Sequence, residues 1–201
     1  MTSTVDIANS ALNLLGASNI AAFDENSKAA RVINQKYPGI RDDLFRQHSW
    51  NCLVRRATLA QSATTPDFGY AYYYPLPTDP YCLRVLEFSN GTMSYPQDNM
   101  HSLSGGPVFV VEGRNIVTDE STAKIKYIAR IEDPNEYDAS LIDTLSQRLA
   151  AEIAYTVTGS GSVRNQMRAD YIDKLSQARN VNATEGAPQR IEASDFIEAR
   201  M

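Results

Sequence analysis

The chain has 201 residues, of which 43% are hydrophobic and 21% are charged, and its formal net charge is −5. These values are typical of a globular protein with one domain and a core of its own. The acidic balance argues against a surface built to grip nucleic-acid phosphates, although it would let DNA slide past without sticking. The composition therefore argues against an ordinary DNA-binding protein.

Targeting and redox signals are weak. The N-terminus lacks the basic region and continuous apolar run of a signal peptide, and no apolar run is long enough to cross a bilayer. Cys52 and Cys82 have neither zinc-finger nor CxxC spacing. We therefore expect a soluble protein made in a reducing cytoplasm, with free cysteines, no metal, no cofactor and no membrane association.

The N-terminal quarter of the chain has the apolar spacing of helices. One helix is predicted over residues 4–15. A second is predicted from Asn26 or Ser27 to His48, with Pro38–Gly39 expected to kink or break it.

The middle of the chain changes to the alternating pattern of strands. The pair Gly113–Arg114 lies between two short apolar runs and suits a hairpin. Residues 89–106 have the composition of a loop, and their number indicates a mobile or functional loop. Strands are predicted over residues 50–59, 69–74, 81–88, 108–112, 115–118 and 123–131.

Two more helices are predicted, over residues 139–157 and 162–180. The short Gly/Ser turn between them favours an antiparallel helix pair, and Asp170 and Lys174 are placed as an i,i+4 ion pair on the outer side. The tail, residues 186–201, has isolated apolar residues among charges, so it is disordered unless it orders on a partner, and the second alternative is slightly favoured.

These patterns predict an α+β fold in which N-terminal helices (4–48) and C-terminal helices (139–180) form a bundle around a central antiparallel β-rich insert, 50–131. Residues 1–185 then form a single domain, followed by a flexible C-terminal docking tail, 186–201. Neither an internal repeat nor a low-complexity tract is visible.

Chemically versatile residues gather in Arg46–Ala60. A cysteine–histidine nucleophilic pair needs the two side chains in contact, and His48 and Cys52 would meet this need only on a continuous helix. Because the helical pattern ends near Trp50, we favour a structural junction in which Trp50 fills the corner between helix and sheet. No catalytic site is predicted.

Other residues are candidates for contacts with partners. Arg55 and Arg56 are adjacent on a strand and point to opposite faces, so one is an interface anchor or both are solvated. Alternating tyrosines form a base-stacking platform, a sheet core or a subunit contact, and the acidic surroundings favour the last two. The candidate interface residues are Arg55, Arg56, Tyr70, Tyr72, Tyr74, Ile191, Phe196 and Ile197.

An ordered set of residues matches a known family. Its parts are Tyr37, Arg41-Asp42, Leu44, His48-Ser-Trp-Asn51, Arg56-Ala-Thr-Leu-Ala60, Leu76-Pro77 and Leu83-Arg84-Val85. Over roughly residues 4–185 the chain resembles the head-to-tail adaptors, or tail tubular proteins A, of short-tailed bacteriophages (podoviruses). The family pattern has a proline before the tryptophan, where this chain has Ser49.

The resemblance implies helices packed around a β-rich middle and assembly into a dodecameric ring in the neck of the virion. The partners would be the portal protein above, the tail nozzle (tubular protein B) below, and other copies of the chain. DNA would pass through the bore without specific binding, and no enzymatic activity is implied. Two alternatives stay open: a small cytosolic enzyme that uses His48 or Cys52, and a protein-binding module of a bacterial host.

Overall fold

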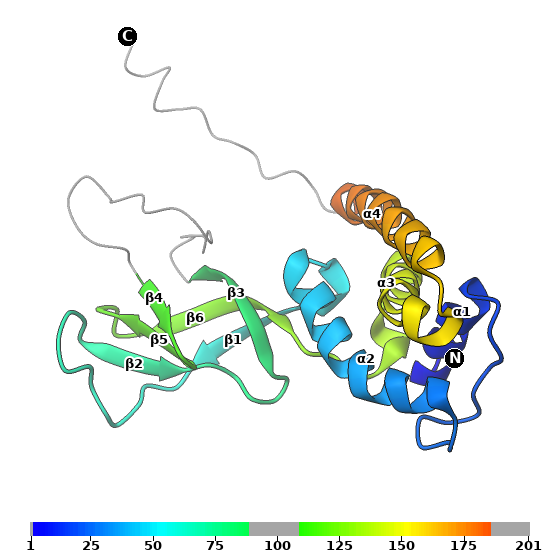
Figure 1. Ribbon diagram of the computed structural model, residues 1–201. Helices are drawn as coiled ribbons and strands as arrows, with labels where there is room; N and C mark the ends of the chain where they lie inside the picture. The colour runs from blue at the N-terminus through cyan, green and yellow to red at the C-terminus, as the bar shows by residue number, and fades with distance from the viewer. Residues whose placement is uncertain (1, 89–108, 186–201) are drawn as a thin grey trace, which may run out of the picture.

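The computed structural model describes residues 2–88 and 109–185. Within these ranges the fold is mixed α+β, with four α-helices and two three-stranded antiparallel sheets, as predicted at that level. The strands lie between α2 and α3 in the chain and beside the helices in space (Figure 1). The elements are α1 (Thr4–Leu14), α2 (Lys28–Gln47), η1 (Asn51–Leu53), β1 (Val54–Leu59), β2 (Tyr72–Pro75), β3 (Cys82–Phe88), β4 (Phe109–Glu112), β5 (Asn115–Thr118), β6 (Ala123–Ala129), η2 (Pro134–Glu136), α3 (Ala139–Thr158) and α4 (Gly161–Thr184).

Each sheet is built around one central strand. The first has the order β1-β6-β3, with Val54 opposite Ile128, and the second has the order β2-β5-β4. The β4–β5 hairpin turns at the predicted Gly113, whose φ of 58° is a conformation that glycine adopts without steric cost. The hairpin and the central strands therefore follow directly from the sequence pattern.

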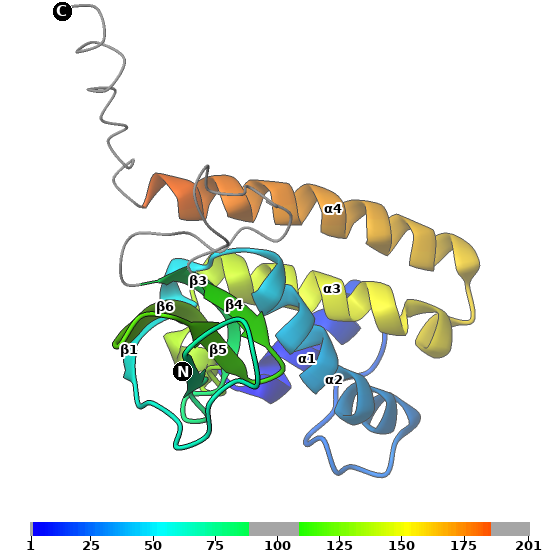
Figure 2. The ribbon, with the colours of Figure 1, turned by 90° about the vertical axis from the view of Figure 1, so that its left-hand side faces the viewer.

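The helix α3 is the centre of the helical part and packs against α1, α2 and α4 (Figure 2). Its apolar stripe, which includes Leu141, Leu145 and Leu149, is buried among these neighbours. Gly159, with φ of 70°, ends α3, and Ser160 caps α4 through the backbone N–H of Val163. The short turn places α3 and α4 side by side.

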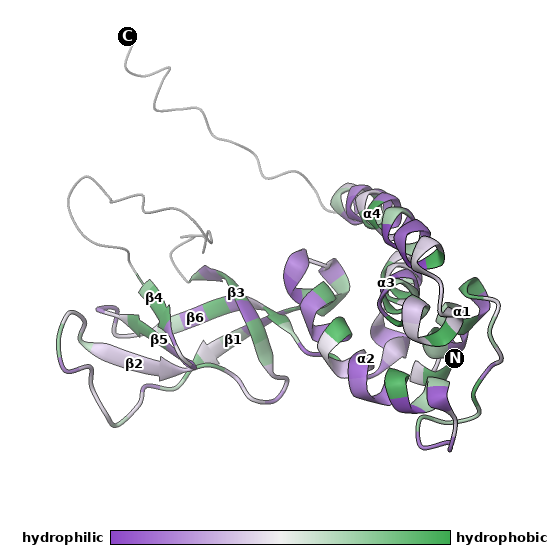
Figure 3. Cartoon of the chain, viewed as in Figure 1, coloured by the Kyte–Doolittle hydropathy of each residue, from purple (hydrophilic) through white to green (hydrophobic). Residues whose placement is uncertain are grey.

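Hydropathy separates these two helices. Figure 3 shows polar residues along much of α4, where only Tyr171, Ala178 and Asn182 are buried.

Across the two described ranges, no helix is both long enough and apolar enough to cross a membrane. One hydrophobic cluster contains residues of the helices and of both sheets, so the two parts of the molecule share a core.

Several predicted boundaries were wrong. Trp50–Leu53 form the lead-in and a 3-10 turn, so β1 begins at Val54. The helix α2 runs unbroken through Pro38–Gly39, so the predicted break is wrong, while the alternative of a kink stays a prediction. Pro38 leaves only the Asn34 carbonyl without its helical donor, and both residues are exposed, so water can replace that donor.

The last helix also departs from the prediction. It continues to Thr184, four residues beyond the expected end. Lys174 pairs with Asp143 of α3 at 2.9 Å, while Asp170 accepts a hydrogen bond from Gln166. The lysine therefore ties the two helices together, because a carboxylate on the neighbouring helix is within reach.

Candidate functional site

The sequence-predicted junction lies where α2 passes into β1. The helix ends at Gln47, and His48 takes an extended conformation with φ of −145°. Trp50 is fully buried, and its indole Nε1 donates to the Leu44 carbonyl at 3.2 Å. That bond satisfies both the indole and a carbonyl near the helix end, which has no helical donor.

Asn182, near the end of α4, binds this junction from the side. Its Oδ1 accepts from the Asn51 backbone N–H at 2.9 Å, and its Nδ2 donates to the Ser49 carbonyl at 3.1 Å. The Asn51 side chain returns a hydrogen bond to the Asn182 carbonyl at 2.9 Å. Asn182 is only 6% exposed, so α4 meets the segment that follows α2 at one buried amide.

The same amide fixes the protonation state of His48. Because Oδ1 faces Asn51, the Nδ2 of Asn182 points at His48 Nε2, 3.0 Å away. An amide NH2 group only donates, so Nε2 is the acceptor and the imidazole is neutral. Burial, and then the positive charges of Arg179 and Arg84, lower the pKa of His48 in the same direction. His48 also packs edge-to-face on Trp50, with ring centroids 4.9 Å apart.

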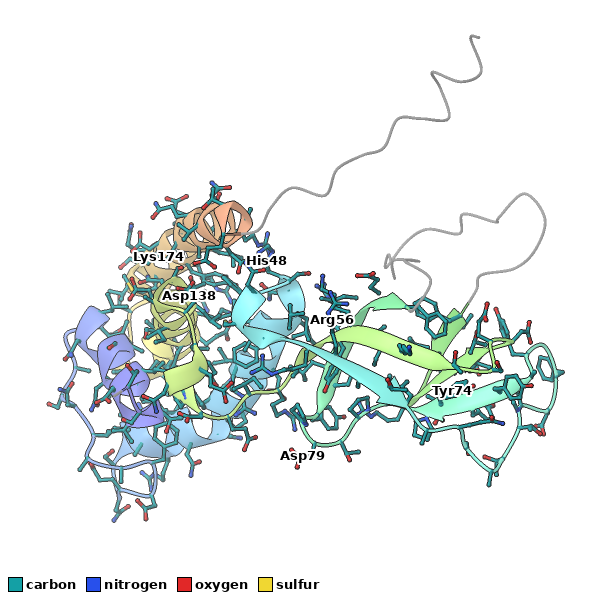
Figure 4. The ribbon with its side chains drawn as sticks, turned by 180° about the vertical axis from the view of Figure 1, so that it is seen from behind. His48, Arg56, Tyr74, Asp79, Asp138 and Lys174 are labelled. Atoms are coloured by element: carbon teal, nitrogen blue, oxygen red, sulfur yellow. The ribbon has the colours of Figure 1, made fainter. Side chains whose placement is uncertain are left out.

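The geometry does not assemble a nucleophile. His48 bonds to Asn182 on α4 (Figure 4), whereas Cys52 lies in the following 3-10 turn, η1. Burial raises the pKa of the Cys52 thiol, which opposes the thiolate that a nucleophilic cysteine needs. Cys52 and Cys82 are both free thiols. The junction residues thus have contacts that suit packing.

The two arginines of β1 differ. Arg55 forms an ion pair with Glu136 at 2.6 Å and donates to the carbonyls of Cys52 and Val54. It therefore fastens β1 to the segment before α3. Arg56 is exposed on the sheet (Figure 4), where it remains a candidate for contact with a partner.

The tyrosines also divide. Tyr74 is 1% exposed, lies in β2 away from the junction (Figure 4), and donates to the Glu120 carbonyl at 2.9 Å. Tyr72 is half-buried and packs edge-to-face on Tyr74 with a centroid distance of 6.4 Å. Tyr70 precedes the strand, which begins at Tyr72, and it too is half-buried. Because Tyr74 is buried, only Tyr70 and Tyr72 of the three candidate tyrosines expose side-chain surface that a partner could contact.

A group of ion pairs ties α2 to the end of β6. Arg41 is 8% exposed and lies 3.0 Å from Asp42 and 3.4 Å from Glu132. Asp42 also binds Arg130, which follows β6. This network links α2 to the segment that follows β6.

Sequence reasoning missed two features of this region. Asn182 lies four residues after buried Ala178, so continuation of the helical stripe was a signal for it. The second feature is a pocket of about 370 Å³ that contains Arg46, Arg84 and Arg114. These arginines come from α2, β3 and the β4–β5 hairpin, so no local pattern brings them together.

Three predicted interface residues, Ile191, Phe196 and Ile197, lie outside the described residues, as does the loop 89–106. Within the described residues, no group of three or more His, Cys, Asp or Glu side chains is placed to hold a metal ion. No protein-family model matches the chain, and no curated protein matches it in sequence.

Proposed function

We propose that the protein is a structural component of a virion, a head-to-tail adaptor that forms a ring between the portal and the tail nozzle of a short-tailed bacteriophage. In this proposal the four helices act as a bundle that carries the β-rich part at a fixed angle. DNA passes through the bore, where a chain with net charge −5 does not trap it.

One observation carries the proposal: several residues of the family pattern make structural contacts at or near the junction between α2 and the first sheet. Trp50 bonds to Leu44, Asn51 bonds to Asn182, and Arg41 pairs with Asp42. A pattern of buried contacts at one junction supports a shared architecture, which is what an adaptor resemblance implies. A catalytic family would instead share residues around a reactive group.

Exposed apolar residues lend further support to assembly. Phe68, in the loop between β1 and β2, is 90% exposed, and Ile172 on α4 is 64% exposed. Contact with neighbouring copies would cover such side chains, and aromatic anchors are enriched in protein interfaces. The tail 186–201 is proposed as a further docking segment for the portal or a neighbouring copy.

Sedimentation of the purified protein with the portal ring tests the proposal. The expected result is comigration at one adaptor per portal subunit, with a tail-deleted variant that keeps its fold but assembles less. Unchanged portal binding by the deleted variant would refute the role of the tail. A folded protein that never comigrates with the portal would contradict the adaptor function itself.

A further inference from the structure

The arginine pocket is lined by residues from the C-terminal end of α2, the start of β3 and the β4–β5 hairpin. Its volume of about 370 Å³ falls in the range of ligand sites in proteins. Besides its three arginines, the walls include apolar and aromatic side chains, among them Leu76, Tyr81 and Val111. The pocket therefore combines positive charge with apolar surface.

The three guanidinium groups have no carboxylate partner among the described residues, where other ion pairs use Arg41, Arg55, Arg130 and Arg148. No Asp or Glu lines the pocket. The buried Nε of Arg84 makes no hydrogen bond within the described part of the chain. In a protein with net charge −5, three uncompensated cations around one hollow form an anion site.

The arginines are held in place by the pocket itself. Arg46 donates to the Leu83 carbonyl at 2.7 Å, and Arg114 donates to the carbonyls of Cys82 and Pro77 at 2.6 and 2.8 Å. Arg114 also stacks on Tyr81, with its guanidinium carbon 3.9 Å from the ring centroid. Carbonyls hold a guanidinium without neutralising its charge, so the positive charge is pre-organised.

The neighbouring charges repel one another. Burial, and then the charge of Arg46, lower the pKa of the Arg84 guanidinium. An anion in the pocket would remove part of this repulsion. The apolar walls favour a carboxylate carried on an apolar peptide segment over a nucleic-acid backbone. The sugars and phosphates of such a backbone would gain little from contact with Leu76 or Val111.

The chain contains such a segment. Residues 191–198, Ile-Glu-Ala-Ser-Asp-Phe-Ile-Glu, place three carboxylates among three large apolar side chains, with no basic residue. The last described helix is linked to one arginine of the pocket, because Asn182 bonds to the carbonyl of Ser49, whose hydroxyl accepts from Arg84 at 3.0 Å. Six residues lie between Glu185 and Glu192, so the seven Cα-to-Cα steps reach at most about 25 Å when extended.

We propose that the pocket of Arg46, Arg84 and Arg114 binds the acidic, apolar C-terminal segment 191–198 of the same chain. Charge complementarity supplies the attraction, and the short tether supplies a high effective concentration. The apolar side chains of the segment rest on the apolar walls. This proposal is independent of the portal, because it concerns the free protein.

The test compares backbone and arginine Nε–H NMR signals of the full-length chain and of E192Q/D195N/E198Q. We expect shifts at Arg84 and at the Gly113–Arg114 hairpin, and none for the matched control D173N, which alters an exposed α4 carboxylate. A peptide of residues 191–201, added to the neutralised variant, should restore the wild-type signals, whereas its Gln/Asn version should not. R46Q, made in the neutralised variant, should weaken peptide binding about tenfold, the usual worth of a charged hydrogen bond.

Three results would overturn the proposal. The first is an absence of any difference at the pocket between the wild type and the neutralised variant. The second is a difference that fades on dilution, which would assign the segment to a second copy. The third is a pocket that responds to duplex DNA or inorganic phosphate but not to the peptide. None of these results involves the portal, so a failure of the pocket proposal would not refute the adaptor proposal.

Discussion

Replacement of Asn182 by alanine should measure how much the junction contributes to stability. The change removes three side-chain hydrogen bonds, to Asn51, Ser49 and His48, at a residue that is 6% exposed. Each bond contributes about 0.5–1.5 kcal/mol net. Water recovers part of this loss, because Asn51 is exposed and Ser49 is half-buried. Alanine also gains a few tenths of a kcal/mol in helix propensity, so we expect a net loss of about 2 kcal/mol.

The chain provides its own probe and control. Trp50 is the single tryptophan and lies in the same junction, so its fluorescence during urea unfolding reports on this site. The matched control is Asn180→Ala, an exposed position in the same helix. Asn182→Ala should lower the unfolding free energy by about 2 kcal/mol, equivalent to about 4–8 °C in Tm, while Asn180→Ala should leave it unchanged or slightly raised.

Equal stability of the two variants would refute the reasoning. It would mean that the buried amide adds nothing beyond helix propensity, and that α4 does not fasten the junction. A loss confined to Asn182→Ala with an unchanged denaturant slope would support the contact geometry.

Three other predictions follow from single contacts. Burial and nearby arginines lower the pKa of His48, so the unfolded chain binds this proton more readily and stability should fall as pH drops through about 6.5. Urea midpoints at pH 7.5 and 5.5 measure this loss, and His48→Gln should reduce the difference between the two midpoints. A difference in His48→Gln as large as in the wild type would contradict the prediction. Asp42→Asn breaks pairs with buried Arg41 and with Arg130 and should cost about 2 kcal/mol in thermal unfolding, against under about 1 kcal/mol for the exposed neighbour in Asp43→Asn. Gly159→Ala, at φ of 70°, should lower the unfolding free energy by about 1–2 kcal/mol, whereas Gly161→Ala inside α4 should not lower it. Equal effects in thermal unfolding would refute the left-handed backbone conformation of Gly159 at the end of α3.

Local signals predicted the elements of the fold well. The hairpin turn at Gly113 and the Gly/Ser turn that ends α3 at Gly159 depend on neighbouring residues, and the structure contains both of them. The corner at Trp50 also followed from a change of periodicity, from helical to alternating. Patterns of this kind need no knowledge of the tertiary structure.

Features that depend on distant residues were not predicted. Asn182 continues the spacing of the buried helical positions, but it lies in a stretch whose composition is typical of a loop, and its contact with residues 49–51, which supports the added helical turn, is tertiary. Lys174 has a carboxylate four residues away, but the tertiary contact places Asp143 at 2.9 Å. The three arginines of the pocket come from separate elements, so sequence spacing holds no trace of the pocket.

Electron microscopy of the purified protein mixed with a phage portal ring tests the central proposal most directly. The account predicts an added collar that has the rotational order of the portal, with the helices and the β-rich part in fixed relation within each copy. A bare portal, with the protein left in solution as a folded monomer, would contradict it. Turnover of a substrate that disappears with His48→Ala or Cys52→Ala would contradict it as well, in favour of an enzyme.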